Sequence, residues 1–268
     1  LAFCVAAVLI GGVKRIASVS QIVVPFMAVI YVVFVIVLIV CNITAVPAAF
    51  QVIVKAAFSP RAVTGGAVGS MLVAMQKGVA RGIFSNEAGL GSAPIAAAAA
   101  QTKEPVRQGL VSMTGTFIDT IVICTLTGLS IVLTGAWQVD GLEGVQVTTY
   151  AFQKGLPFPE EVSAFILMLC LVFFAFTTIL GWDYYSERCL EYLSGGNMKS
   201  VKVFRWIYIF AVFIGPYMTV SAVWTIADIF NGLMALPNMI ALFALSGVVV
   251  KETKTFFAKQ KAQKEAGK

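Results

Sequence analysis

Residues 64–102 read TGGAVGSMLVAMQKGVARGIFSNEAGLGSAPIAAAAAQT, and this stretch decides how the chain folds. It is long enough for two membrane crossings, but the charges at Lys77, Arg81 and Glu87 leave no room for two apolar runs of about 20 residues. Glycines lie at its start and centre, and it ends in an alanine run that favours a helix. We therefore predict one interrupted crossing over residues 64–102, made of two half-helices with an unwound backbone between Arg81 and Ser92.

An unwound backbone at membrane depth restricts what can surround it. Its N–H and C=O groups cannot face lipid without partners, so the segment lines a cavity or is wrapped by protein. Carbonyls near residues 83–85 are predicted to accept hydrogen bonds from an ammonium group, and N–H groups opening the second half-helix favour an anionic group. The alternative interpretation is a glycine-rich cytoplasmic loop between two ordinary helices.

Glu87 has two interpretations that the residues alone leave open. A carboxylate inside a membrane protein is a candidate proton or cation site. The same side chain is also suited to pair with Arg81 or to cap the second half-helix.

The composition places the whole chain in a membrane. Of its 268 residues 59% are hydrophobic and 12% are charged, whereas a soluble domain carries about 25% charged residues. Several runs carry no charge and approach the length needed to cross a bilayer. These uncharged runs are residues 22–41, 108–118, 162–182, 206–227 and 229–250. We predict an all-α polytopic membrane protein with a single transmembrane domain over residues 1–250 and a basic tail over residues 251–268.

The order of the predicted segments follows from these runs and from the turn residues between them. The chain starts without a charged leader, so residues 1–10 are interpreted as the end of a span whose beginning is missing, and the fold as incomplete at the N-terminus. Gly215-Pro216 predicts a turn, and Ser194-Gly195-Gly196-Asn197 predicts the end of a long helix. The predicted segments are a link at 11–20, spans at 22–41, 107–134, 162–182 (helical to 193), 203–218 and 225–250, and an interfacial helix at 47–58.

The basic residues predict the orientation. With alternate crossings, fourteen Lys and Arg residues fall on one side and three (Lys55, Arg61 and Lys154) on the other. An excess of this kind marks the cytoplasmic side, so the C-terminal tail is predicted to lie in the cytoplasm against anionic lipid headgroups. The net charge of +6 is therefore not interpreted as a nucleic-acid site.

Several classes of function are disfavoured by what the sequence lacks. It has five scattered cysteines and no histidine, which excludes a Cys/His metal site and removes the commonest general base. It carries no nucleophile or metalloprotease motif and no repeated selectivity-filter sequence. We expect neither an enzyme nor a channel, and no cofactor other than a coupling ion.

Long motifs in the chain resemble those of the alanine/glycine:cation symporter family, the sodium:alanine symporters. The resemblance covers nearly the whole chain. Its motifs are GVARGIFSNEAGLGSAPIA at 78–96, PVRQGL at 105–110, FIDT at 117–120, TTILGW at 177–182 with Glu187-Arg188, and ADIFNGLMA at 227–235. One position departs from the pattern, because Ala97 stands where many relatives carry histidine.

This resemblance implies a LeuT-like (APC superfamily) inverted-repeat fold, with substrate bound near the bilayer midplane and the interrupted segment as its sixth core helix. The first core helix, which supplies the other half of the sites, is expected to be missing from this chain. The implied substrate-binding residues are Phe84, Ser85, Asn86, Gly89, Gly91 and Trp182. For Trp182, an anchor at the membrane interface is the alternative interpretation.

The resemblance also implies a sodium site on the eighth helix. Its ligands would be the carbonyl of Phe174 and the hydroxyls of Thr177 and Thr178, neutral oxygens of the kind that sodium prefers. Ordinary hydrogen bonding of the hydroxyls to helix carbonyls is the alternative.

The expected function is sodium-coupled symport of alanine or glycine across the plasma membrane by alternating access. Proton coupling through Glu87 or Asp119 is the alternative. The sequence leaves the choice between alanine and glycine, the enantiomer and the oligomeric state undetermined.

Overall fold

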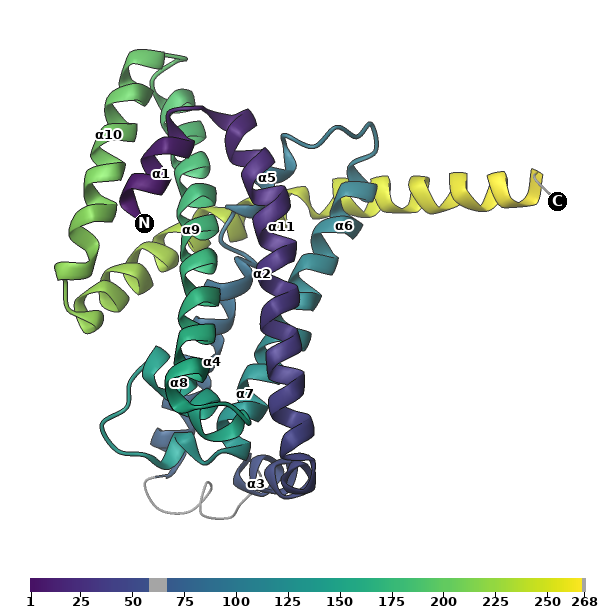
Figure 1. Cartoon of the computed structure of the whole chain (residues 1–268). Helices are drawn as coiled ribbons and strands as arrows, with labels where there is room; N and C mark the ends of the chain where they lie inside the picture. The colour runs from purple at the N-terminus through teal and green to yellow at the C-terminus, as the bar shows by residue number, and fades with distance from the viewer. Residues whose placement is uncertain (58–66, 267–268) are drawn as a thin grey trace. The chain divides into compact units, whose positions relative to one another are not determined.

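The computed structural model describes residues 1–57 and 67–266, and within these ranges every regular element is helical (Figure 1). Residues 58–66, which include Arg61 and the start of the predicted interrupted crossing, lie outside the described part, as do residues 267 and 268. The chain divides into two compact units. The first comprises Leu1–Ala74 and Val122–Tyr217, and the second comprises Met75–Ile121 and Met218–Lys268.

The first unit is built around α9 (Glu160–Leu193), which packs against α2, α8 and α10. The buried residues of α9 recur at helical spacing and form one face. That face contains Ser163, Leu167, Cys170, Thr177, Leu180, Asp183 and Glu187. The other elements of this unit are α1 (Ala2–Leu9), α2 (Val13–Cys41), η1 (Ile43–Ala45), α3 (Val46–Ala57), α7 (Cys124–Leu133), η4 (Ala136–Gln138), α8 (Val145–Gly155), α10 (Met198–Ile214) and η5 (Gly215–Tyr217).

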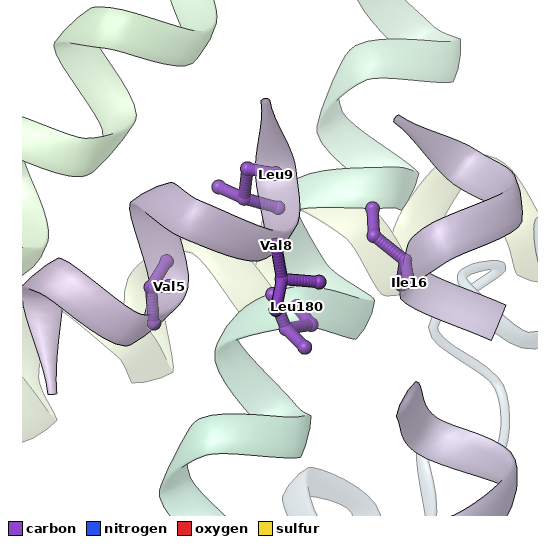
Figure 2. Packing of buried hydrophobic residues seen from close by; sticks show 5 residues of the cluster. All are labelled: Val5, Val8, Leu9, Ile16 and Leu180. Carbon is purple, nitrogen blue, oxygen red and sulfur yellow. The ribbon is translucent and has the colours of Figure 1, made fainter. Parts of the chain in front are cut away.

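Two apolar clusters hold the first unit together. Figure 2 shows one of them, in which residues of α1 and the start of α2 meet Leu180 of α9. Its buried members are Val5, Val8, Leu9, Ile16 and Leu180. The second cluster joins α2 to α8 and α9 through Val35, Leu38, Phe152, Leu156 and Leu167.

The ends of α9 and α10 follow from local sequence. Glu160 and Glu161 lie in the first turn of α9, where negative charge favours the helix dipole. Gly195 and Gly196 adopt φ of 63° and 87°, and the N–H of Gly196 donates to the carbonyl of Glu191 at 2.8 Å. The side chain of Asn197 then caps α10 by accepting a hydrogen bond from the N–H of Lys199. The predicted stop at these residues is confirmed.

The second unit contains the last turns of α4 (Ala67–Asn86), then α5 (Ala93–Ala97), α6 (Pro105–Phe117), the start of the π-helix η3 (Ile118–Ile123) and α11 (Val220–Ala266). Within this unit α6 packs against α5 and α11. α4 begins in the first unit, and η3 continues into it.

Four helical stretches of the described chain are long and apolar enough to cross a bilayer: Arg15–Cys41, Pro105–Leu133, Glu160–Leu193 and Val220–Glu265. They coincide with the predicted spans at 22–41, 107–134, 162–182 and 225–250. The crossings at 203–218 and 64–102 stay predictions, because α10 has 17 residues and carries Lys199, Lys202 and Arg205.

The predicted link at 11–20 is wrong. Only Ile10, Gly11 and Gly12 lie between α1 and α2, which already begins at Val13. The basic tail at 251–268 stays a prediction, and its residues up to Ala266 continue the helix α11. The tail is rich in Ala, Lys, Glu and Gln, which are strong helix formers, and charge alone does not end a helix.

Candidate functional site

The second unit contains the predicted helix interruption. α4 ends at Asn86, the backbone is non-helical from residue 87 to 92, and α5 begins at Ala93. Three residues of the break adopt positive φ: Glu87 at 56°, Gly89 at 86° and Gly91 at 83°. Glu87 is the one residue other than glycine with positive φ in the described chain, so the surrounding structure holds it in a strained conformation.

The break is shorter than predicted and starts later. Residues 81–86, which include Phe84, Ser85 and Asn86, are helical rather than unwound. The reason is that neither the charge of Arg81 nor the single glycine at Gly82 is enough to end a helix with good neighbours. Phe84, Ser85 and Asn86 instead lie in the last turn of α4, where the carbonyls have no partner within the helix.

Two side chains of that last turn bind to the π-helix η3. The hydroxyl of Ser85 lies 2.8 and 3.0 Å from the two carboxylate oxygens of Asp119. The amide of Asn86 donates to the hydroxyl of Thr120 at 3.0 Å, and its Oδ1 accepts from the N–H of Ala88 at 2.9 Å. A π-helical turn is rare and frequently marks a functional site. The sequence placed Asp119 among the proton candidates, whereas its contact with Ser85 appears only in the structure.

The break itself is held by α11 and by its own carboxylate. Asn238 of α11 donates its side-chain amide to the carbonyl of Gly89 at 2.9 Å. The hydroxyl of Ser92, which is buried, donates to Glu87 at 2.7 Å. Because Ser92 immediately precedes α5, this bond ties the Glu87 carboxylate to the start of the second half-helix.

Arg81, one turn before the end of α4, binds two residues of α11. Its guanidinium lies 2.8 Å from the carboxylate of Asp228 and 3.9 Å above the ring of Trp224. Phe84 packs edge-on against the same ring at 5.1 Å between centroids. The last turn of α4 is therefore fixed to α11 by charge and by aromatic packing.

The predicted sodium ligands lie on α9 in the first unit. The hydroxyl of Thr177 is buried and lies 3.1 Å from the carbonyls of both Phe173 and Phe174. Two of the predicted ligand atoms, the Thr177 hydroxyl and the Phe174 carbonyl, therefore lie close together. The contact between them is a hydrogen bond within the helix, which was the alternative interpretation. A hydroxyl that donates to a carbonyl keeps lone pairs that can face a cation, so the sodium site stays a prediction. Thr178 is exposed in this chain, and its hydroxyl forms no hydrogen bond within the described residues.

Trp182 is half-buried one turn further along α9, and its ring packs edge-on against Tyr185 at 5.7 Å. It belongs to the first unit, whereas the other predicted substrate residues belong to the second. Its part in a substrate pocket stays a prediction.

An open hollow of about 510 Å³ lies between α5 and α6 in the second unit. None of the predicted substrate residues lines it. Its lining is mostly small side chains, together with Lys103 and Gln108: Ala93, Pro94, Ala97, Ala98, Ala100, Thr102, Pro105, Gly109 and Ser112.

Sequence reasoning missed several residues that the structure brings to these sites. Asn238 and Thr120 carry no motif that predicts their contacts, because each partner is distant in the chain. Asp228 was quoted within a motif without a role, although an acid in an apolar segment is itself a signal. The same signal marks Asp183, a buried acid of α9.

Apolar helices of bilayer-crossing length define the class of this molecule, which is a multi-pass membrane protein. Residues 1–268 match the sodium:alanine symporter family, and the chain belongs to that family. The named relatives in this family are transporters and not enzymes.

Three relatives illustrate the similarity. The chain is 56% identical over 255 residues to an uncharacterized transporter of Haemophilus influenzae, covering 95% of this chain and 55% of that protein. It is 48% identical over 259 residues to the sodium/alanine symporter AgcS of Methanococcus maripaludis, covering 96% and 55%. It is 39% identical over 258 residues to the probable sodium/glutamine symporter GlnT of Bacillus subtilis, covering 96% and 52%. The chain therefore spans about half the length of these relatives.

Proposed function

We propose that the complete protein is a sodium-coupled symporter that carries a small neutral amino acid, alanine or glycine, across the plasma membrane by alternating access. The observation that carries this proposal is the helix break at residues 87–92, with its three positive φ values, in a chain of the sodium:alanine symporter family. Broken helices of this kind expose backbone dipoles to a charged solute in the membrane.

The substrate would bind at the end of α4. The last carbonyls of this helix, those of Phe84, Ser85 and Asn86, have no helical partner and lie at the negative end of the helix dipole. They suit the ammonium group of an amino acid. Gly89 and Gly91 let the solute approach the backbone closely but leave little room for a long side chain, which favours alanine or glycine.

The sodium ion would bind on α9, at the Phe174 carbonyl and the hydroxyls of Thr177 and Thr178. In support, the Thr177 hydroxyl lies 3.1 Å from the Phe174 carbonyl on the buried face of α9. Sodium would be a co-transported ion here rather than a resident cofactor, and alternating access would come from movement of helices around the bound solutes.

The test is uptake of radiolabelled alanine into proteoliposomes that contain the complete protein. Uptake is expected when external sodium exceeds internal sodium, and it is expected to stop when choline replaces sodium. Competition by unlabelled glycine and glutamine measures the size limit of the pocket, with glycine expected to compete and glutamine not. Uptake that persists in choline and follows the pH gradient alone contradicts sodium coupling.

A further inference from the structure

The acid Asp183 on α9 is buried without a partner. Its side chain is fully inaccessible to solvent (0% exposed), and neither carboxylate oxygen accepts a hydrogen bond within the described structure. An ionised carboxylate in this environment has lost its hydrating water and accepts no hydrogen bond in its place. Burying a charge in this way carries one of the largest free-energy costs in a protein. Asp183 therefore requires a compensating charge.

The neighbouring charges do not provide it. Glu187, one turn further along the same face of α9, is also buried and accepts both hydrogen bonds of the Arg205 guanidinium, at 2.5 and 2.9 Å. That pair is neutral by itself. The hydroxyl of Tyr208 donates to the carbonyl of Ile179 at 2.9 Å, so its proton is not available to Asp183.

Among the side chains that the structure describes, the other elements packed against this part of α9 bring no further buried charge. α1 carries one titratable side chain, the exposed thiol of Cys4, and the nearby end of α2 carries Arg15, whose side chain is also exposed. One turn before Asp183, Leu180 lies in the apolar cluster with Val8 and Leu9 (Figure 2). The carboxyl group is thus enclosed by apolar side chains on one side and by a neutral ion pair on the other.

We propose that Asp183 is a proton-binding site, occupied in this state and exchanged during transport. The carboxylate takes a proton from a hydronium ion, leaving water, when the helices around it admit solvent, and it becomes the neutral acid when they close. This proposal deepens the proposed function and rests on it, because it makes transport depend on protons as well as on sodium.

A proton satisfies this site better than a metal ion does. A sodium ion needs several oxygen ligands, but both oxygens of the nearby Glu187 carboxylate are taken by the Arg205 guanidinium. No group of three or more acidic, cysteine or histidine side chains able to hold a metal occurs among the described residues. A proton needs only one lone pair of the carboxylate.

The position of Asp183 links it to the predicted sodium ligands. Thr177, Leu180 and Asp183 follow one another along the buried face of α9. Asp183 lies six positions after Thr177, which is about 9 Å along a helix axis. A movement of α9 that exposes one of these sites is therefore expected to change the surroundings of the other.

The first test reads the protonation state directly and does not depend on transport. Infrared spectra of the purified complete protein at neutral pH are expected to contain the C=O stretch of a protonated carboxyl group, which shifts in D₂O. The band is expected to shift with ¹³C-labelled aspartate, which needs no substitution, and to disappear in Asp183→Asn. The matched control is Glu161→Gln, which removes an exposed acid from the same helix and is expected to leave the band unchanged.

The second test measures the pH dependence of sodium-driven alanine uptake. The wild-type rate is expected to change several-fold between pH 5 and pH 9, and the Asp183→Asn rate is expected to be nearly independent of pH while sodium dependence remains. A band that survives Asp183→Asn, or a wild-type pH profile in that variant, overturns the proposal. Uptake driven by the pH gradient without sodium would instead overturn sodium coupling and leave the Asp183 site standing.

Discussion

Asn238 and Gly89 are joined by a hydrogen bond of 2.9 Å between the side-chain amide of α11 and the carbonyl of the helix break, across 149 positions of the sequence. Asn238 follows Pro237, which lacks an N–H and leaves the carbonyl of Leu233 without its helical donor. The side chain that binds the helix break therefore comes from a turn of α11 in which one backbone hydrogen bond is missing.

Replacing Asn238 with Ala is expected to loosen the break. The carbonyl of Gly89 loses its donor, which costs about 1–3 kcal/mol for a group that is shielded from water. Alanine uptake is expected to fall by roughly tenfold or more, since 1.4 kcal/mol corresponds to a factor of ten. Ser246→Ala, at an exposed position of the same helix, is the control and should transport normally. Equal rates for both variants would show that the bond to Gly89 does not order the site.

A side chain at Gly91 is expected to be poorly tolerated. Its φ of 83° disfavours any residue with a Cβ by about 1–2 kcal/mol, and the added carbon would lie 3.2 Å from the side chain of Asn238. Gly91→Ala is therefore expected to lower both thermal stability and uptake. Gly82→Ala is the matched control, because Gly82 lies within α4 and the added carbon has no atom of the described residues within 4 Å apart from the adjoining backbone of its own helix. That variant should be as stable as the wild type or slightly more stable.

Breaking the pair between Glu187 and Arg205 is expected to destabilise the first unit strongly. Glu187→Gln leaves a mostly buried guanidinium without its charge partner, which typically costs about 3–5 kcal/mol. The ion pair of Arg188 with Glu191 is about one-third exposed, so Glu191→Gln should cost about 1 kcal/mol or less. Thermal unfolding of the detergent-solubilised protein compares the two variants. A smaller loss of stability in Glu187→Gln than in Glu191→Gln would contradict this ranking.

Removing the hydroxyl of Thr178 is expected to affect sodium more than alanine. If Thr178 is a sodium ligand, Thr178→Ala raises the sodium concentration for half-maximal uptake several-fold and leaves the alanine requirement nearly unchanged. Thr149→Ala on α8, whose hydroxyl bonds to a carbonyl of its own helix, serves as the control. An equal rise in both requirements would count against a sodium site at this position.

Transport is expected to depend on the planar guanidinium group of Arg81 as well as on its positive charge. Arg81→Lys keeps a cation near Asp228 but loses the planar stack on Trp224, which is worth about 0.5–2 kcal/mol. Uptake should fall in Arg81→Lys and fall further in Arg81→Gln, which loses both interactions. Full activity of Arg81→Lys would show that charge alone holds the end of α4 against α11.

The amino-acid sequence by itself determined the class of protein, the positions of the crossing helices and the existence of a break near Gly89. These features are local: the length of an apolar run, the conformational freedom of glycine and the absence of charge act within a few turns of helix. The predicted start of the break at Arg81 was too early, because a charge and a single glycine do not end a helix whose neighbours favour it.

Only the tertiary structure decided which side chains hold the break and which acid is left without a partner. Asp119 contacts Ser85 at the end of α4 from 34 positions away, Asn238 contacts Gly89 in the break from 149 positions away, and no local pattern contains such distances. Asp183 and Glu187 are both acids of one apolar helix, yet α10 supplies a guanidinium to Glu187 and none to Asp183. Burial and pairing depend on the neighbouring helices, so these charges acquire different roles only when the chain is folded.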